Sequence, residues 1–533
     1  MPTIELDLMD FEFLLGRDLP GDIEELNEIL AYVKGEVKSI DDEEIRIELK
    51  DSNRADIWST EGLARALRGF LGLEKGLKEY DIVGSSGVEV DVDPKLEKIR
   101  PYIGCAVVRG VKLSDAAIRQ IMRFQDKMDQ TYGRNRRRTS IGLYEFDLVK
   151  PPLRYTAAKP DEVSFVPLEF SERLTLEQIL ERHPKGKEYG SIIRQYPFWP
   201  VFIDSEDQVL SFPPIINSDD LGRISERTRN VLIEVTGTSY ETVMDTLVNV
   251  TVTLADRGGE IYSATIHYPY SGIADDVTPN LEVETMRLEL SYIRRIIGLE
   301  LSAGEIASLL ERARYGVAEL SENEITIQVP CYRVDVLHPI DVVEDIAIAY
   351  DYNRIPDEWP RLATVGRTSD ETAFRDLIRE IMIGLGFQEV LTYIMSNPEN
   401  LFRRMNLAPK RVVELANPKI ASMTCLRSWL LPSLLELLSH NVHVDYPQRI
   451  FEVGYCVIHD EKRENKTRDL EELACVNIHS NANFTEAKSQ MDALFSNLGI
   501  EYELEEAEHG SFISGRAGKV TVNGCELGII GEI

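Results

Sequence analysis

Four carboxylates around residue 340 give the sharpest chemical signal in the sequence. Asp341, Glu344 and Asp345 are spaced i, i+3 and i+4 after Pro339, which predicts a helix start, so the three acids share one helical face. Asp335 precedes them on the segment leading in. Four oxygen ligands without His or Cys suit a hard cation such as Mg²⁺, and either a metal or a basic partner would relieve their repulsion. The alternative is that acids in a first helical turn only complement the helix dipole.

A basic cluster is the second signal. Arg134, Arg136, Arg137 and Arg138 form a run of four cations in a chain whose formal net charge is −32. Such a chain repels nucleic acid on average, so any RNA contact must use a local basic patch or a basic partner. The run indicates either phosphate contact or a solvated loop or interface, and its spacing does not choose between them.

Composition limits the class of protein. At roughly 150 residues per domain, 533 residues predict about three or four domains, and 43% hydrophobic with 28% charged residues is ordinary globular composition. No apolar run reaches about 18 residues, so we expect no membrane span, and the acidic N-terminus does not resemble a secretory signal peptide. Six scattered cysteines without C-x-x-C spacing argue against a zinc ribbon or disulfide framework. A reducing cytoplasm fits this usage.

The pattern of elements predicts an α+β chain of four modules. Residues 1–84 form a small α/β module, with a strand at 45–49, a polar turn from Asp51 and an amphipathic helix at 63–70. Residues 85–275 open with two strands and a helix from Ser114, followed by a loop-rich region. Residues 276–360 show two helices and a hairpin, the order of a winged-helix-like module, with capping-box spacing at Ser302 and Glu305.

The last predicted module covers residues 361–533. An apolar stripe from Phe374 to Leu385 predicts an amphipathic helix, and strands follow, interrupted by an apolar helix at 430–438. No internal repeat or low-complexity tract is visible.

Five segments in order, spanning nearly the whole chain, resemble the beta subunit of phenylalanyl-tRNA synthetase of the archaeal and eukaryotic type. They are residues 51–69, residues 141–155, Phe212-Pro-Pro-Ile-Ile-Asn-Ser218 with Glu234-Val-Thr-Gly-Thr238, residues 333–354, and residues 426–435. No single segment is decisive, but the collinear set is specific. The family continues as a strand past Ile533, so the resemblance leads us to expect a truncated or naturally shortened C-terminus.

The resemblance implies a phenylalanine–tRNA ligase in which this chain supports an alpha subunit, two alpha with two beta chains. The alpha subunit would attach phenylalanine to tRNA(Phe) with ATP. Residues 85–275 would be an editing module that hydrolyses mischarged Tyr-tRNA(Phe), with pocket residues Ser211, Asn217, Glu234 and Thr236 by position. Without the resemblance, the favoured interpretation is a strand-edge surface acid for Glu234 and a turn hydroxyl for Thr236.

The resemblance also bears on the metal and on the last module. Asp335, Asp341, Glu344 and Asp345 resemble a Mg²⁺ site shared with the alpha subunit. Residues 361–533 resemble a class II synthetase core, an antiparallel sheet flanked by helices. The Phe-Arg-x-Glu element of a working core is missing, since the segments beginning at Phe374 and Phe402 lack the glutamate, so we expect a non-catalytic core. The competing hypotheses are a free-standing aminoacyl-tRNA editing hydrolase and a winged-helix nucleic-acid-binding scaffold.

Overall fold

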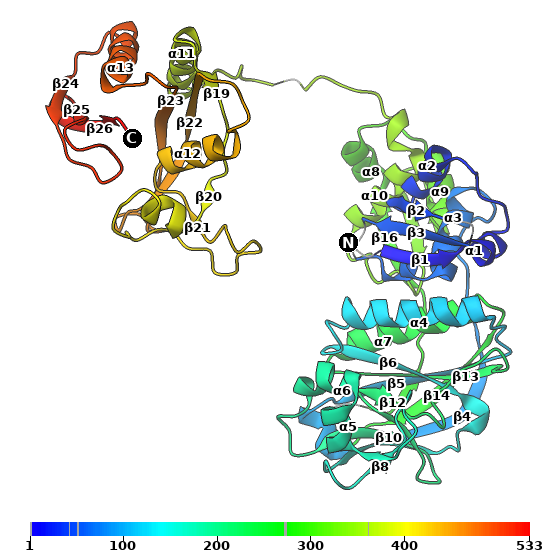
Figure 1. Ribbon diagram of the computed structural model, residues 1–533. Coiled ribbons are helices and arrows are strands. Elements are labelled where there is room, and N and C mark those ends of the chain that lie inside the picture. Colours follow the sequence, from blue (N-terminus) through cyan, green and yellow to red (C-terminus); the bar gives the residue numbers. More distant parts are fainter. Residues whose placement is uncertain (1–2, 42, 51–52, 271–273, 361) are drawn as a thin grey trace. The chain divides into compact units, whose positions relative to one another are not determined.

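The computed structural model describes residues 3–41, 43–50, 53–270, 274–360 and 362–533. The chain divides into two compact units, Met1–Glu358 and Trp359–Ile533, whose elements are drawn in Figure 1. The three modules predicted before residue 361 lie together in the first unit, and their separation into domains stays a prediction. Among the helices that the structure describes, none is long and apolar enough to cross a membrane.

The first unit begins with a three-stranded antiparallel sheet of order β1-β3-β2. Its predicted central strand is present, with Ile45, Ile47 and Leu49 buried at alternate positions. The predicted helix is present as well, and the Ser59 side chain caps it by accepting from the Gly62 N–H. Asp51 and Ser52 of the predicted polar turn lie outside the described residues. The elements are β1 (Thr3–Asp7), α1 (Leu8–Leu15), α2 (Ile23–Ala31), β2 (Gly35–Ile40), β3 (Glu44–Leu49) and α3 (Thr60–Phe70).

A ten-stranded sheet forms the centre of the first unit, with the order β12-β11-β10-β7-β4-β14-β5-β13-β6 and β15 paired to β14. Its pairs are antiparallel except β4 with β14 and β4 with β7. The strands are β4 (Ile82–Val92), β5 (Tyr102–Arg109), β6 (Thr139–Glu145), β7 (Leu153–Ala158), β10 (Trp199–Ile203), β11 (Val209–Phe212), β12 (Ile216–Asn217), β13 (Asn230–Gly237), β14 (Glu260–His267) and β15 (Asp276–Thr278).

Two long helices, α4 (Asp115–Gln130) and α7 (Tyr240–Ala255), lie along one face of this sheet (Figure 1). Phe124 and Leu247 from these helices share a core with Ile233 and Val235 of β13. Because side chains alternate along a strand, Glu234 must point to the other face. A β8–β9 hairpin and two short helices cover the β10–β11 end of the sheet, where Leu176 and Ile179 share a core with Val201: β8 (Ser164–Phe165), β9 (Leu174–Thr175), α5 (Leu176–Arg182) and α6 (Pro184–Tyr189).

The predicted order of two helices and a hairpin is present near residue 300. A strand that the sequence analysis missed, β16, precedes them and completes a sheet of order β16-β18-β17. The capping box is confirmed, since Ser302 and Glu305 each bond the other's backbone N–H. Helix α10 begins at Pro339 as predicted. The elements are β16 (Glu284–Glu289), α8 (Leu290–Ile297), α9 (Ala303–Arg312), β17 (Gly316–Leu320), β18 (Glu324–Val329) and α10 (Pro339–Tyr350).

The second unit is also mixed α/β. Strands β22 and β23 pair antiparallel, but β19 runs parallel to β22, so the expectation of a purely antiparallel sheet is wrong there. The predicted helix at residue 374 forms, yet of this fully described helix only Met382 is buried. The elements are α11 (Asp370–Gly384), β19 (Gln388–Glu389), β20 (Met395–Ser396), β21 (Cys425–Leu426), α12 (Leu431–His440), β22 (Gln448–His459), β23 (Thr467–Ile478), α13 (Phe484–Leu498), β24 (Glu503–Glu506), β25 (Ala517–Val522) and β26 (Cys525–Gly531).

Candidate functional site

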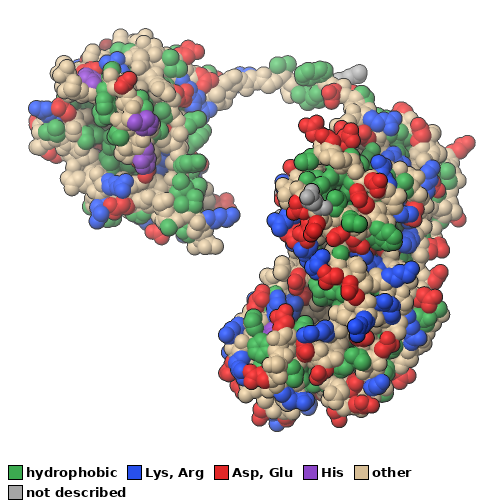
Figure 2. Space-filling view, turned by 45° about the vertical axis from the view of Figure 1, so that its right-hand side comes forward, with side chains coloured by type: hydrophobic (Ala, Val, Ile, Leu, Met, Phe, Trp, Pro, Cys, Tyr) green, Lys and Arg blue, Asp and Glu red, His purple; other side chains and the backbone are tan. Residues whose placement is uncertain are grey.

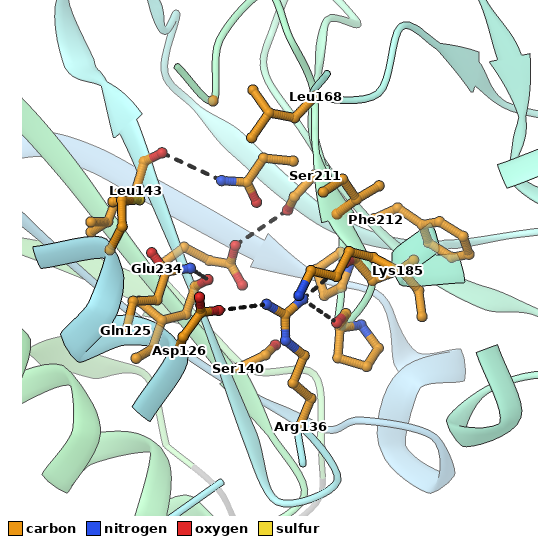
Figure 3. A pocket seen from close by; sticks show the side chains of 18 of the residues that line it. Gln125, Asp126, Arg136, Ser140, Leu143, Leu168, Lys185, Ser211, Phe212 and Glu234 are labelled. Atoms are coloured by element: carbon orange, nitrogen blue, oxygen red, sulfur yellow. Dashed lines mark hydrogen bonds and ion pairs between the residues drawn. The ribbon is translucent and has the colours of Figure 1, made fainter. Parts of the chain in front are cut away.

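A cavity of about 170 Å³ lies where the two ends of the ten-stranded sheet meet. Ser211 on β11 donates to Oε2 of Glu234 on β13 at 3.2 Å, and Asn217 on β12 donates to the Leu143 carbonyl on β6 at 3.4 Å. Since β11 and β12 stand at the opposite end of the strand order from β13 and β6, these bonds mean that the sheet curls until its ends close. Figure 3 shows Ser211 pointing toward Glu234 across this junction.

Three of the four predicted pocket residues line this cavity, which we call the Glu234 cavity: Ser211, Asn217 and Glu234. Glu234 is only 2% exposed. Burial raises the pKa of its carboxyl above the ordinary value, although hydrogen bonds from Tyr144 and Ser211 and the charge of Arg100 oppose the shift. The Tyr144 hydroxyl donates to Oε2 at 2.6 Å. The result is a buried carboxyl group with hydrogen-bond donors around it, at the edge of a partly open cavity.

Gly142 is the residue that makes room for this carboxyl group. It stands directly opposite Glu234 in the pairing of β13 with β6. A Cβ atom at position 142 would lie 2.3 Å from the Tyr144 hydroxyl oxygen and 2.5 Å from Glu234 Oε2, closer than side chains tolerate. The sequence does not single out Gly142 and Tyr144, which stand only within a family segment, because their role depends on cross-strand register.

Thr236, the fourth predicted residue, lies two positions further along the same strand face. It is fully buried, and it is not among the described residues that line the Glu234 cavity. Its hydroxyl accepts from Arg100 Nε at 3.0 Å, and Arg100 also donates to the Thr236 carbonyl at 2.5 Å and to Ser140 Oγ at 3.0 Å. Thr236 therefore helps to hold a buried arginine behind Glu234.

A second arginine, Arg136, forms a wall of the Glu234 cavity (Figure 3). Its Nη1 donates to the carbonyls of Ile215 at 2.9 Å and Pro214 at 3.2 Å, which fixes the loop between β11 and β12. Its Nε lies 2.9 Å from Asp129 Oδ2. Burial raises the pKa of Asp129 to about 7, against the lowering effect of Arg136. The Arg136 side chain thus ties the end of α4 to the loop between β11 and β12.

No Ser/His/Asp arrangement is present among the described residues that line the Glu234 cavity. The described residues that line it include no histidine or cysteine. His183 binds the Leu168 carbonyl and packs on Phe170, and His267 pairs with Asp275, so both histidines have structural contacts. The arrangement can bind a small ring with a hydroxyl group.

The predicted metal cluster is held by protein donors. Arg333 donates to both oxygens of Asp335 at 2.8 Å and to Asp345 Oδ2 at 2.7 Å. Burial acts to raise the pKa of Asp335, but the charge and hydrogen bonds of Arg333 outweigh it and the pKa lies below its ordinary value. Asp341 Oδ2 accepts the backbone N–H groups of residues 337 and 338, and Glu344 pairs with Lys34 at 2.7 Å.

These contacts do not fit a Mg²⁺ ion held by this chain alone. Within the described ranges, no group of three or more His, Cys, Asp or Glu side chains is arranged to hold a metal. Arg333, two residues before Asp335, supplies the countercharge that a metal was expected to supply. Asp341 caps its helix, which matches the dipole alternative. The Mg²⁺ site stays a prediction.

Two family descriptions match the second half of the chain. Residues 286–352 match the "tRNA synthetase B5 domain", and residues 355–533 match the "Phenylalanyl tRNA synthetase beta chain CLM domain".

Relatives match over the whole length. The phenylalanine–tRNA ligase beta subunit of Pyrococcus furiosus is 47% identical over 100% of this chain and 95% of its own length, and that of Thermofilum pendens is 39% identical over 100% and 94%. A crystal structure of an N-terminal fragment of the Pyrococcus horikoshii phenylalanyl-tRNA synthetase beta subunit covers 66% of this chain and 100% of that fragment. Its TM-score is 0.63 at 42% identity. The chain belongs to the phenylalanine–tRNA ligase beta-subunit family.

Proposed function

We propose that this chain pairs with an alpha subunit, two of each, and supports the attachment of phenylalanine to tRNA(Phe). The alpha subunit would bind ATP and phenylalanine, since the second unit lacks a Phe-Arg-x-Glu element. A partner also accounts for apolar side chains exposed on that unit, some of which Figure 2 displays. Leu391 is 81% exposed, Tyr393 72% and Val442 68%. Six free cysteines support a reducing cytoplasm.

The proposal's second part is that the Glu234 cavity clears Tyr-tRNA(Phe). A phenylalanine slot rejects an added hydroxyl by only about 10²-fold, so a second site is needed. The cavity of about 170 Å³ is slightly larger than the ~150 Å³ cavities that hold benzene, so a phenol ring fits its scale. The single observation that carries this function is the buried Glu234 carboxyl group at the edge of that space.

Discrimination would come from the acceptor capacity that the Glu234 carboxyl group keeps beyond its bonds from Tyr144 and Ser211. A tyrosine ring can donate its hydroxyl to the carboxylate, whereas a phenylalanine ring leaves the buried acceptor without that bond. Sites built to bond a substrate hydroxyl can reject the analogue lacking it by about 10⁴-fold. The correct product, Phe-tRNA(Phe), would therefore be spared.

The chemistry of this proposal is ester hydrolysis. Water attacks the carbonyl carbon of the tyrosyl ester, and the terminal ribose oxygen of the tRNA leaves and takes up a proton. Glu234, Ser211 and Tyr144 position the ring, and the Asn217 amide and the Arg136 guanidinium hold the surrounding wall. The alternative of a nucleic-acid scaffold has no such reaction.

The test is Glu234→Gln, which keeps the shape and removes the charge. A hydrogen bond to a charged group contributes about 1.5–3 kcal/mol, so Tyr-tRNA(Phe) deacylation should fall roughly 10- to 150-fold. Glu97→Gln, at an exposed acid of the same module, is the matched control and should be neutral. Unchanged deacylation in Glu234→Gln removes the editing role. Deacylation by the chain without any alpha subunit would favour the free-standing hydrolase.

We also propose that Mg²⁺ binds at Asp335, Asp341, Glu344 and Asp345 only when the alpha subunit adds ligands. The support is that Arg333 and Lys34 already engage three of these carboxylates. Electron spin resonance of Mn²⁺ added to the chain alone and to the complex checks this. Tight Mn²⁺ binding by the chain alone would contradict it.

A further inference from the structure

A second cavity of about 610 Å³ lies outside the Glu234 cavity, between the N-terminal module, the end of α4 and the segment before α10. Its walls include three cations and two aromatic rings, and we call it the basic cleft: Lys127, Arg134, Arg138, Trp58 and Tyr132. The walls are joined, because Gln120 Oε1 on α4 accepts from the Thr60 hydroxyl at 2.7 Å and from the Asp7 N–H at 3.1 Å.

The cations of the basic cleft lack acidic partners. Within the part of the chain that the structure describes, Lys127, Arg134 and Arg138 enter no ion pair. This is unusual in a chain with 91 acidic and 59 basic residues, and acidic and basic side chains are interspersed over the face drawn in Figure 2. The one acid among the described lining residues is Asp335, and Arg333 engages both of its oxygens. The basic cleft therefore holds uncompensated positive charge.

A turn with unusual backbone geometry presents two of these cations. Arg134, Asn135 and Arg136 have φ of 50°, 53° and 61°, a left-handed conformation that side chains rarely adopt. The turn is held by backbone bonds from Arg136 to Asp129 at 2.9 Å and from Arg138 to Gly133 at 2.8 Å. It places Arg136 in the wall of the Glu234 cavity, and it places Arg134 and Arg138 in the basic cleft. One rigid turn thus serves both cavities.

Trp58 is an independent sign of a missing ligand. The residue lines the basic cleft and is 3% exposed, and its Nε1 has no hydrogen-bond partner among the described residues. Buried donors are nearly always satisfied. An indole N–H donates only, so it needs an oxygen acceptor such as a phosphate or ribose oxygen.

We propose that the basic cleft binds a phosphate-bearing strand of the tRNA whose esterified end enters the Glu234 cavity. Only the entry of the esterified end into the Glu234 cavity rests on the proposed editing function. Three cations match a single strand crossing the cleft, where stacking on Tyr132 adds sequence-independent attraction. RNA is favoured over a free nucleotide because three separate cations and two aromatic side chains line one cleft, which suits successive phosphates and a base of a strand.

The experiment compares tRNA binding by the assembled enzyme as KCl is raised. Each phosphate neutralised on a single strand contributes about −0.7 to the slope of log affinity against log salt, so three contacts contribute about −2. Between 50 and 200 mM salt this is roughly a 20-fold loss of affinity. The variant with Lys127→Gln, Arg134→Gln and Arg138→Gln should bind tRNA more weakly at low salt and lose that part of the slope.

The matched control is Arg137→Gln, an exposed cation in the same run that does not line the basic cleft among the described residues. It should leave both affinity and slope unchanged. Trp58→Phe keeps an aromatic side chain, though a smaller one, but removes the N–H, and it should weaken tRNA binding several-fold. The triple variant should also raise the KM of Tyr-tRNA deacylation. Equal slopes in the triple variant and the parent overturn the proposal, as does an equal effect of Arg137→Gln.

Two further outcomes separate this inference from the editing proposal. If the parent enzyme does not hydrolyse Tyr-tRNA, but the triple variant still loses tRNA affinity and salt slope, the basic cleft stands and the editing function falls. AMP is the probe for a nucleotide pocket. Tight AMP binding that the triple variant abolishes, with tRNA affinity unchanged, would overturn the strand-binding proposal.

Discussion

Gly142→Ala is the substitution that tests the geometry of the Glu234 cavity most directly. The new methyl group would point at the place where the Tyr144 hydroxyl meets the Glu234 carboxyl group. No charge changes and no hydrogen-bonding group is removed. Any effect must therefore come from displacement of these two side chains.

The magnitude follows from the distances. Real Cβ atoms stay at least 3.0 Å from such neighbours, so at 2.3 Å and 2.5 Å the two oxygens must retreat by at least 0.7 Å (3.0 − 2.3) and 0.5 Å (3.0 − 2.5). Overpacking of this kind costs about 1–3 kcal/mol in folding free energy. Loss of a hydrogen bond to a charged group adds about 1.5–3 kcal/mol. We expect a destabilisation of roughly 2.5–6 kcal/mol and a 10- to 150-fold slower Tyr-tRNA(Phe) deacylation.

The assay pairs deacylation of Tyr-tRNA(Phe) with urea unfolding, each on the parent and two variants. Gly84→Ala is the control, because Gly84 lies in β4 of the same sheet and a Cβ there meets nothing within 4 Å. Phenylalanine attachment by the assembled enzyme should be unchanged in both variants. If Gly142→Ala unfolds and deacylates as the parent does, the carboxyl group at Glu234 does not recognise the ring hydroxyl.

Three further predictions concern buried charge. The folded pKa of Asp129 is about 7 against an ordinary 3.8, so its contribution to stability is complete below pH ~4 and is lost as pH rises through 7. Relative to the parent, the free energy of unfolding of Asp129→Asn should therefore rise by up to about 4 kcal/mol over that pH range, as measured by urea unfolding. A difference between the two proteins that does not change with pH would refute this. Arg333→Met strands Asp335 and Asp345 and should cost about 3–5 kcal/mol by the same assay; a loss below about 1 kcal/mol contradicts the pairing. EDTA should leave the melting temperature of the isolated chain unchanged. A clear drop would mean that the chain binds a metal without a partner.

Local sequence signals predicted local structure well. Pro339 marked the start of α10, and the capping box at Ser302 and Glu305 formed as expected, because each depends on residues within one helical turn. The alternation in β3 predicted its buried face for the same reason. These features depend little on tertiary context, which is why one sequence was sufficient to predict them.

The Glu234 cavity was accessible from the sequence only in part. The family resemblance pointed to Ser211, Asn217 and Glu234, which do line one cavity. Gly142 and Tyr144 were missed, because only the register of β13 with β6 places them beside Glu234. No local pattern specifies which strands meet when a sheet curls.

For the carboxylates near residue 340, the sequence did not predict their partners within the chain, and the Mg²⁺ site stays a prediction. Helical spacing correctly placed three acids on α10, but it took no account of cations from outside the helix. Arg333 precedes the helix and Lys34 lies on a distant segment, and both pair with the cluster. The amphipathic stripe of α11 shows the same limit, since Phe374 remains 49% exposed despite its helical period.

Because the ten-stranded sheet closes upon itself, binding of a ligand in the Glu234 cavity requires the whole sheet to be folded. The Glu234 cavity depends on the contact between β11 and β13, which lie far apart in the strand order and meet only because the strands between them are in place. Unfolding of a single strand between them would separate β11 from β13 and remove the cavity. Under the proposed editing function, damage to the sheet would remove recognition of the ring hydroxyl and hydrolysis together, so a partly unfolded copy would be inert instead of attacking correctly charged tRNA.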